Sequence, residues 1–313
     1  MEERLKNSTH DLGKSSPRVN WQVWWRLLRP HTLTAGFVPV LVGTMLALPY
    51  GELDLSVFAA MMVASLLIQS ATNMFNEYYD FKRGLDTAES VGIGGAIVRE
   101  GISARTVLNL AISFFGIAVL LGIYICMNSS WWIGLIGALS MAVGYYYTGG
   151  PYPIAYTPFG ELAAGLFMGL ILILISFFIQ SGTVTAESIL VSVPVSILVG
   201  GILMANNIRD LTGDKEKGRK TLAILLGHKK AVLFLAGMFI VSYLWIIGLV
   251  LAGYASSWLL LVFISLPKAM KAYKLFVGKT KAVQMVPAMK ATAQMHTIFG
   301  FLLSVGLLFN YLF

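Results

Sequence analysis

The stretch NEYYDFKRGLD, which runs from Asn76 to Asp86, ends a long apolar segment with a cluster of carboxylates, bases and an amide. The segment before it is long enough to cross a bilayer, since a transmembrane helix needs about 20 apolar residues. An aspartate costs roughly 2.5–3.5 kcal/mol at the centre of a bilayer and less near its edge. The cluster is therefore expected at a membrane surface, where it forms a candidate functional site.

The composition predicts an all-α integral membrane protein. Of 313 residues, 57% are hydrophobic and 12% are charged, whereas about 25% of the residues of an average soluble domain are charged. A soluble fold cannot bury this much apolar surface. The single cysteine, Cys126, excludes an intramolecular disulfide and a cysteine metal site. The apolar runs predict nine transmembrane helices, at about 32–50, 55–80, 105–127, 131–148, 159–180, 187–208, 230–252, 256–275 and 292–312.

The charged residues predict the orientation in the membrane. With nine spans, all 23 Lys and Arg residues fall on one side, and the other side carries only Glu52, Asp54 and Glu187. Because positive residues collect on the cytoplasmic side, the N-terminus and the candidate site are expected to face the cytoplasm, with the protein in the cell membrane. The net charge of +8 thus indicates topology, and nucleic-acid binding is not expected.

Two regions are expected along the chain. Residues 1–29 are polar and basic and predict a cytoplasmic segment that ends in an interfacial anchor, in which Trp21, Trp24 and Trp25 lie beside Arg26. Residues 30–313 predict one nine-helix membrane domain that carries the site.

A second polar cluster lies at the end of the sixth predicted helix. Asn206-x-x-x-Asp210 repeats the pattern Asn76-x-x-x-Asp80 after 130 residues. The two helices are four spans apart, so they run in the same direction and both clusters lie at the cytoplasmic end. This indicates a parallel repeat rather than the inverted repeat of many transporters.

The spacing within each cluster predicts a shared metal site. Residues four apart lie on one helix face, and Gly84 is expected to end the second helix so that the chain turns back after it. Several carboxylates near one another resist joint ionisation, and Mg²⁺ bound through oxygen relieves the repulsion. The predicted metal ligands are Asn76, Asp80, Asp86, Asn206, Asp210 and Asp214.

The neighbouring bases predict a phosphate site around such metals, because Lys and Arg bind phosphate oxygens. The expected diphosphate-binding residues are Arg99, Arg209, Lys215, Lys220 and either Lys82 or Arg83. Glu77 is expected either to contact metal or to face solvent. A cluster of this kind suits a magnesium-bound diphosphate at the mouth of a bilayer-embedded cavity.

With these motifs in place, the chain resembles the UbiA superfamily of intramembrane aromatic prenyltransferases, and within it the 1,4-dihydroxy-2-naphthoate polyprenyltransferases of menaquinone synthesis. The resemblance covers nearly everything after residue 27. It implies nine helices around a central cavity, with two Asp-rich motifs that bind Mg²⁺ and a prenyl diphosphate. The stretches that carry it include NEYYDFKRGLD, IVREGIS, YYYTGGPYPIAYTPFGE and NNIRDLTGDKEKGRKTLA.

Carried over to this chain, the motifs assign catalytic roles to Asn76, Asp80, Asp210 and Asp214. Asn73 lies on the same helix face as the first pair and is expected in the substrate pocket. The chain departs from the family pattern in two places. Many relatives have an acidic residue where this chain has Gly84, which leaves Asp86 as the substitute. Many also carry a base in the loop after the fourth helix, whereas residues 145–161 contain no Lys or Arg.

The resemblance implies prenyl transfer from a polyprenyl diphosphate to 1,4-dihydroxy-2-naphthoate, with loss of CO₂. Tyr79, Tyr145 and Tyr147 can face the allylic cation in the substrate pocket, although interfacial belt residues have the same composition. The alternatives are another acceptor (4-hydroxybenzoate, homogentisate or haem), a cation-coupled transporter, and a non-catalytic quinone- or lipid-binding protein. Transport sites usually lie near the bilayer midplane, which favours the enzyme.

Overall fold

A computed structural model describes residues 21–86 and 95–313, so most of the expected N-terminal segment lies outside the described residues. Helices and turns make up this part of the chain, without a strand. The elements in chain order are α1 (Trp21–Leu28), α2 (Thr34–Leu46), η1 (Leu48–Tyr50), α3 (Leu55–Lys82), α4 (Ala104–Asn128), α5 (Trp131–Tyr146), η2 (Ile154–Tyr156), α6 (Gly160–Ala164), the π-helix η3 (Gly165–Ile171), α7 (Leu172–Ser181), α8 (Ala186–Glu216), α9 (Leu222–Leu226), α10 (His228–Leu251), η4 (Ser257–Ser265), α11 (Leu266–Phe276) and α12 (Ala282–Leu312).

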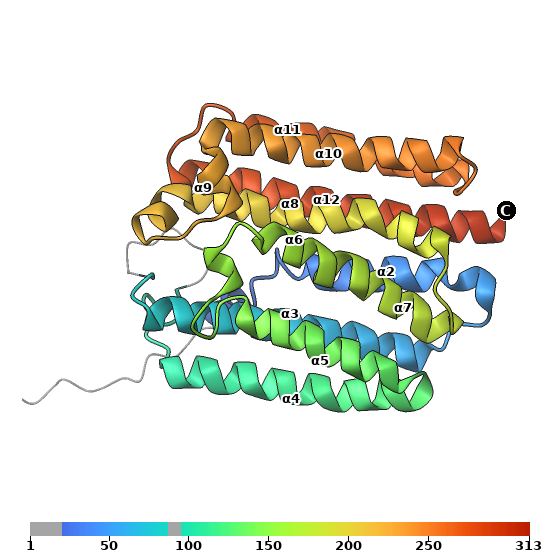
Figure 1. The fold of residues 1–313 in the computed structure, drawn as a ribbon, viewed down its shortest axis with the longest axis horizontal. Helices are drawn as coiled ribbons and strands as arrows, with labels where there is room; N and C mark the ends of the chain where they lie inside the picture. Colours follow the sequence, from blue (N-terminus) through green and yellow to red (C-terminus); the bar gives the residue numbers. More distant parts are fainter. Residues whose placement is uncertain (1–20, 87–94) are drawn as a thin grey trace, which may run out of the picture.

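The helices lie alongside one another in a bundle (Figure 1). Helix α8 runs through its middle and packs against α2, α10, α12 and η3, while α3 packs along α4. The short connections 51–54, 129–130, 182–185 and 252–256 lie at the end where the chain terminates. The longer connections lie at the opposite end together with α9, and this is the end of α3 and α8 that carries the polar clusters.

Six of the described helices are long and apolar enough to cross a membrane. They are Leu55–Lys82, Ala104–Asn128, Gly160–Ser181, Ala186–Glu216, His228–Leu251 and Ala282–Leu312. Two shorter apolar segments, Thr34–Tyr50 and Trp131–Tyr146, accompany them. The all-α, multi-pass membrane fold predicted from the sequence is confirmed, while the count of nine spans stays a prediction.

Two helices are longer than the sequence predicted. Helix α8 continues from the expected end at 208 to Glu216, and α12 begins at Ala282 rather than near 292. Hydropathy alone marks only the apolar part of each helix. In α8 the additional turns are polar, and they carry the second Asp motif out of the apolar region on continuous helix.

Close packing of small residues fixes α8 against α6–η3–α7, one continuous helix with a π-helical middle segment. A Cβ added to Gly165 would lie 2.7 Å from the carbonyl oxygen of Ser196, and one added to Gly169 would lie 2.4 Å from the Ser196 Cα. Small residues let membrane helices approach closely in this way. The contact holds the wall of the central cavity at the level of η3.

Candidate active site

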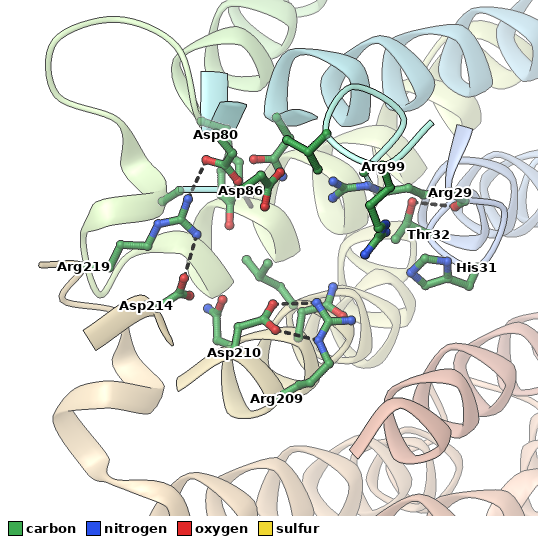
Figure 2. A pocket seen from close by; sticks show the side chains of 18 residues that line it. Arg29, His31, Thr32, Asp80, Asp86, Arg99, Arg209, Asp210, Asp214 and Arg219 are labelled. Atoms are coloured by element: carbon green, nitrogen blue, oxygen red, sulfur yellow. Dashed lines mark hydrogen bonds and ion pairs between the residues drawn. The ribbon is translucent and has the colours of Figure 1, made fainter. Parts of the chain in front are cut away.

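The two Asp motifs face one another across a polar pocket of about 120 Å³ (Figure 2). Its wall comes from the ends of α3 and α8, from the residues before α2, and from the segments 95–99 and 147–155. All six predicted metal ligands line it, namely Asn76, Asp80, Asp86, Asn206, Asp210 and Asp214. The parallel arrangement inferred from the repeated pattern therefore brings the two halves together at one end of the bundle.

Helix α3 supplies the first half of the site and ends where the sequence predicted. It stops at Lys82, and Gly84 takes a φ of +68°, a conformation that glycine adopts without a steric penalty. The backbone N–H groups of Leu85 and Asp86 then donate to the Asp80 carbonyl at 2.8 and 3.4 Å. This turn brings Asp86 back toward Asp80, and burial followed by the negative charge of Asp80 raises the pKa of Asp86 to about 6.

Helix α8 supplies the second half, with Asn206, Asp210 and Asp214 on one face at intervals of four residues. Arg209 holds Asp210 in a two-pronged ion pair, with Nε and Nη2 at 2.7 and 2.5 Å from the two carboxylate oxygens. Such a paired geometry orients both planes. Arg209 was predicted to bind diphosphate, and its guanidinium lies in the pocket wall.

Arg219 joins the two halves of the site, and the sequence analysis missed it. Its guanidinium lies 2.6 Å from Asp80 and 3.1 Å from Asp214 (Figure 2). Gly218 precedes it and takes a φ of +78°, which turns the chain back after α8. The turn brings the Arg219 backbone N–H to the Asp214 carbonyl at 3.0 Å, which leaves the side chain beside both carboxylates.

Three of the predicted diphosphate-binding bases are not among the residues that line the polar pocket. Lys215 and Lys220 are exposed, since the chain turns between them so that Arg219 faces inward instead. The Lys82 ammonium lies over the Tyr78 ring, 5.9 Å from its centre. Its neighbour Arg83 donates to the carbonyls of Thr148 and Gly150 and so holds the loop after α5.

The opposite wall carries further positive groups, including Arg99, which was predicted, and Arg29, which was not. His31 lies beside them, and burial followed by the charges of Arg29 and Arg209 lowers its pKa to about 3. The imidazole is therefore neutral at physiological pH. The sequence analysis gave His31 no role in the site, and no local pattern distinguishes its position from an ordinary helix start.

The donor set fits a hard divalent cation, for which carboxylate and amide oxygens are the preferred protein ligands. One observation supports this fit directly, since the buried Oδ1 of Asn206 has no hydrogen-bond partner. In the described part of the chain, no three His, Cys, Asp or Glu side chains are close enough together to hold a metal as they stand. Arg209 and Arg219 hold three of the carboxylates, so a cation bound there would share these groups with the two guanidinium groups or displace them.

A larger apolar cavity of about 210 Å³ adjoins the polar pocket. It extends between α3, α5, η3 and α8, and Asn76, Tyr147 and Asn206 line both spaces. Asn73, which was predicted in the substrate pocket, lines the apolar cavity and donates to the Leu28 carbonyl at 3.0 Å and to Thr32 Oγ1 at 2.9 Å. The site thus joins a charged head-group space to an apolar one.

Tyr79 and Tyr145 line neither space, in contrast to Tyr147. Their hydroxyls share a hydrogen bond of 2.6 Å, and they pack in a cluster with Phe75 between α3, α4 and α5. The helical period predicts which residues share a face of a helix, but it does not predict which neighbouring helix packs against that face. The positions of Tyr79 and Tyr145 therefore differ from the prediction.

Comparison with known proteins agrees with this geometry. The model of the UbiA prenyltransferase family matches residues 36–307. The chain belongs to the UbiA prenyltransferase family. A 1,4-dihydroxy-2-naphthoate octaprenyltransferase of Bacillus subtilis is 61% identical over 96% of this chain and 97% of its own length. The protein of the same name from Escherichia coli is 25% identical over 91% and 95%.

Solved structures of UbiA homologues show the same fold. The apo structure from Aeropyrum pernix superposes with a TM-score of 0.67 at 18% identity, covering 88% of this chain and 98% of that one. The homologue from Archaeoglobus fulgidus bound to GPP and Mg²⁺ gives 0.63 at 16% identity, covering 90% and 99%. The UbiA-type fold predicted from the two motifs is therefore confirmed, and family membership excludes the transporter alternative.

Proposed function

We propose that this UbiA-family protein transfers a polyprenyl group from a polyprenyl diphosphate to 1,4-dihydroxy-2-naphthoate, with decarboxylation, in menaquinone biosynthesis. The observation that carries the proposal is that the charged pocket adjoins the apolar cavity, since Asn76, Tyr147 and Asn206 line both. A prenyl diphosphate likewise consists of a charged diphosphate group joined to an apolar hydrocarbon chain. The acceptor follows from the 61% identity to the Bacillus subtilis octaprenyltransferase.

The polar pocket is suited to hold the diphosphate. Arg219 lies on one side of it and Arg29 and Arg99 on the other, so cationic groups surround the space between the two motifs (Figure 2). Mg²⁺ held by Asp80, Asp86, Asp210 and Asp214 with the two Asn side chains would stabilise negative charge on the diphosphate. Fixed cationic side chains stabilise the same charge as it develops.

The reaction breaks the allylic C–O bond, whose electron pair leaves with the diphosphate. A carbon–carbon bond forms to the electron-rich naphthalene ring, and the bond between ring and carboxylate breaks to release CO₂. The apolar residues of the larger cavity, such as Leu203 and Val199, keep water away from the reacting carbon. The prenyl chain is hydrocarbon, so it fits the same cavity.

The site is proposed to face the cytoplasm in the cell membrane. The polar pocket lies at the end of the bundle that carries the longer connections. The basic residues of the described connections, including Arg99, Lys217 and Lys279, lie on that side. Basic connections remain on the cytoplasmic side. Residues 1–29 are proposed as a cytoplasmic extension of this end, with 30–313 as the catalytic domain.

A product assay tests the proposal. Purified protein in detergent or lipid receives Mg²⁺, a long all-trans prenyl diphosphate and either 1,4-dihydroxy-2-naphthoate or 4-hydroxybenzoate, and product masses are recorded. A prenylated, decarboxylated naphthoquinol that disappears with EDTA is the expected result. Product from hydroxybenzoate alone would overturn the acceptor but keep the reaction class, whereas no product from either with folded protein would overturn both.

A further inference from the structure

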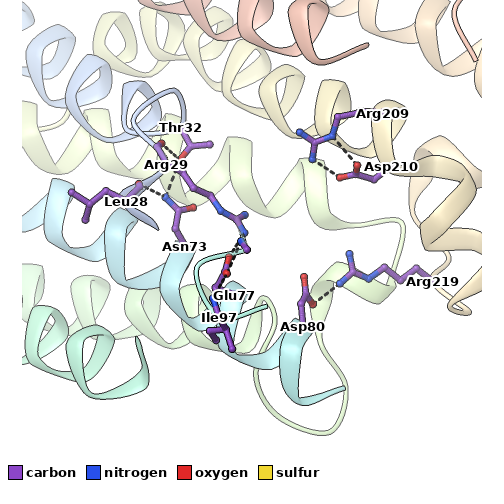
Figure 3. Close-up of polar contacts among 11 residues, drawn as sticks. Leu28, Arg29, Thr32, Asn73, Glu77, Asp80, Ile97, Arg209, Asp210 and Arg219 are labelled. Carbon is purple, nitrogen blue, oxygen red and sulfur yellow. Dashed lines mark hydrogen bonds and ion pairs between the residues drawn. The ribbon is translucent and has the colours of Figure 1, made fainter. Parts of the chain in front are cut away.

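Glu77 is a buried carboxylate to which the two Asp motifs assign no role. It lies on α3 between Asn76 and Asp80, yet it is only 1% exposed and is not among the residues that line the polar pocket. The solvent-facing position, one of the two alternatives expected from the sequence, is therefore wrong, and the metal-ligand alternative stays a prediction. A buried charge needs partners, and those of Glu77 come from two segments far from it in sequence (Figure 3).

One oxygen of Glu77 binds the backbone of the segment after α3. The N–H groups of Gly95 and Ile97 donate to Oε1 at 2.6 and 3.4 Å. The other oxygen, Oε2, lies 3.5 Å from Arg29 Nη2. Glu77 thus links three pieces of chain: α3 itself, the residues that lead into α2, and the turn at 95–99.

Each of the two linked segments presents an arginine to the polar pocket. Arg29 and Arg99 both line it. The backbone N–H of Arg99 donates to the Gly95 carbonyl at 2.8 Å, and a Cβ on Gly95 would lie 2.4 Å from Arg99 Nε. The Arg99 guanidinium therefore rests on the backbone of Gly95, the residue whose N–H Glu77 binds.

A second residue on the same face of α3 supports the arrangement. Asn73 lies one turn before Glu77, and its side chain binds the backbone of Leu28 and the hydroxyl of Thr32, on either side of Arg29 (Figure 3). Arg29 has a φ of +52°, which is unfavourable for a residue with a side chain. Asn73 thus holds the backbone around Arg29 while Glu77 holds its guanidinium.

We propose that Glu77 is a positioning residue that places Arg29 and Arg99 for binding the diphosphate group of the substrate. Helix α3 then contributes to the site in two ways: Asn76 and Asp80 line the polar pocket, and Asn73 and Glu77 hold its cationic wall. The inference rests on the proposed function for the identity of the diphosphate substrate. It assigns Glu77 no contact with substrate or metal.

The decisive test is a double-mutant cycle on diphosphate binding. The variants Glu77→Ala, Arg99→Ala and the double variant are compared for the KM of the prenyl diphosphate and of the naphthoate. Glu77→Ala should raise the KM of the diphosphate about tenfold, the size expected when a charged hydrogen bond is lost. The KM of the naphthoate should stay within about twofold. The double variant should lose less than the product of the two single losses, because coupled residues are not additive. The part of the Glu77 effect that acts through Arg29 should remain.

The controls separate positioning from loss of fold. Glu187→Gln, a charge removal at the start of α8 at the other end of the bundle, should leave both KM values unchanged. If Glu77→Ala does not fold, the cycle is run with Glu77→Gln, which keeps an acceptor for Gly95 but removes the charge that faces Arg29. Additive effects in the cycle, or an equal rise in both KM values, would overturn the proposal.

Direct binding of the prenyl diphosphate with Mg²⁺, followed by calorimetry, separates this inference from the proposed function. If wild type binds the diphosphate but forms no prenylated naphthoquinol, the acceptor assignment fails. The same cycle read on the dissociation constant still decides the role of Glu77. Equal affinity of wild type and Glu77→Ala would contradict it.

Discussion

Arg219 and Asp80 form an ion pair of 2.6 Å between residues 139 positions apart in the sequence. Arg219 also lies 3.1 Å from Asp214, so one guanidinium bridges the two Asp motifs. Both pairs are largely shielded from solvent, with about 13% of the Arg219 side chain exposed. The bridge offsets the repulsion that two facing carboxylates would otherwise suffer, and a bound cation would take over that role.

Replacing Arg219 by alanine should lower kcat/KM for the prenyl diphosphate by about 10²-fold, the equivalent of roughly 3 kcal/mol for a charged hydrogen bond removed from a shielded site. The side chain is placed both to balance the carboxylates and to contact phosphate oxygens. The measurement is a kinetic assay at saturating acceptor, with the prenyl diphosphate varied.

Lys220→Ala provides the matched comparison, because it removes a positive charge from the next residue. Lys220 is exposed and is not among the residues that line the polar pocket. The kcat/KM of the Lys220→Ala variant should stay within about threefold of the wild-type value, as is usual for a substitution at a surface position. A larger loss from Lys220→Ala than from Arg219→Ala would contradict the placement of these two side chains.

Asp210→Asn should abolish prenyl transfer while the protein still inserts and folds. The substitution keeps the shape of the side chain but removes the charge that pairs with Arg209 and that is proposed to bind Mg²⁺. The measurement is the residual turnover as a function of Mg²⁺ concentration. At the Mg²⁺ concentration that is optimal for wild type, the activity should fall by about 10³-fold or more.

Asp54→Asn is the control for this charge removal. Asp54 caps the start of α3, where its Oδ1 accepts from Ser56 and Val57. Asp80 lies near the opposite end of the same helix, about 40 Å away at 1.5 Å per residue. Asparagine is an equally good N-cap, so activity should not change. Wild-type turnover by Asp210→Asn would refute its assignment to the metal site.

Binding of Mg²⁺ together with inorganic pyrophosphate should raise the Tm of the purified protein. Ligand at a hundred times its Kd stabilises a folded protein by about 2.7 kcal/mol, and neither component alone should match the pair. The measurement is thermal unfolding in detergent, followed by intrinsic fluorescence. Asp80→Asn should lose the shift, and a shift of the same size in that variant would exclude Asp80 from the metal site.

The arrangement of the Asp motifs was predictable because a helix fixes its own geometry. Asn76 and Asp80, like Asn206 and Asp210, share a face once the segment is helical. Their common position at the end of parallel helices then follows from counting spans. Asp86 was also predictable, because Gly84 marks the end of α3.

The cationic wall could not be predicted in the same way, because tertiary contacts determine it. Whether Arg219 or Lys220 faces inward depends on the turn at Gly218, and Arg29 faces the pocket through a backbone conformation with positive φ. The burial of Glu77 depends on a segment 18 residues away along the chain. A residue pattern along one helix contains no information about such partners.

The apolar cavity should limit the length of the prenyl chain, and Gly137 offers a way to test this. It lies on α5 in the cavity wall, and a Cβ added there would meet no heavy atom within 4 Å. Gly137→Leu should therefore fold and place an isobutyl group into a cavity of about 210 Å³. The KM should rise with the chain length of the prenyl diphosphate, by about tenfold for a long donor and little for a short one.

Gly116→Leu is the matched control for that prediction. Gly116 lies on α4, is exposed on the outer surface of the bundle, and likewise leaves a new Cβ without neighbours within 4 Å. Both variants replace a helical glycine, so both gain the same helix propensity. Only Gly137→Leu should discriminate between donors. If the two variants show the same dependence on donor length, the cavity beside α5 does not hold the prenyl chain.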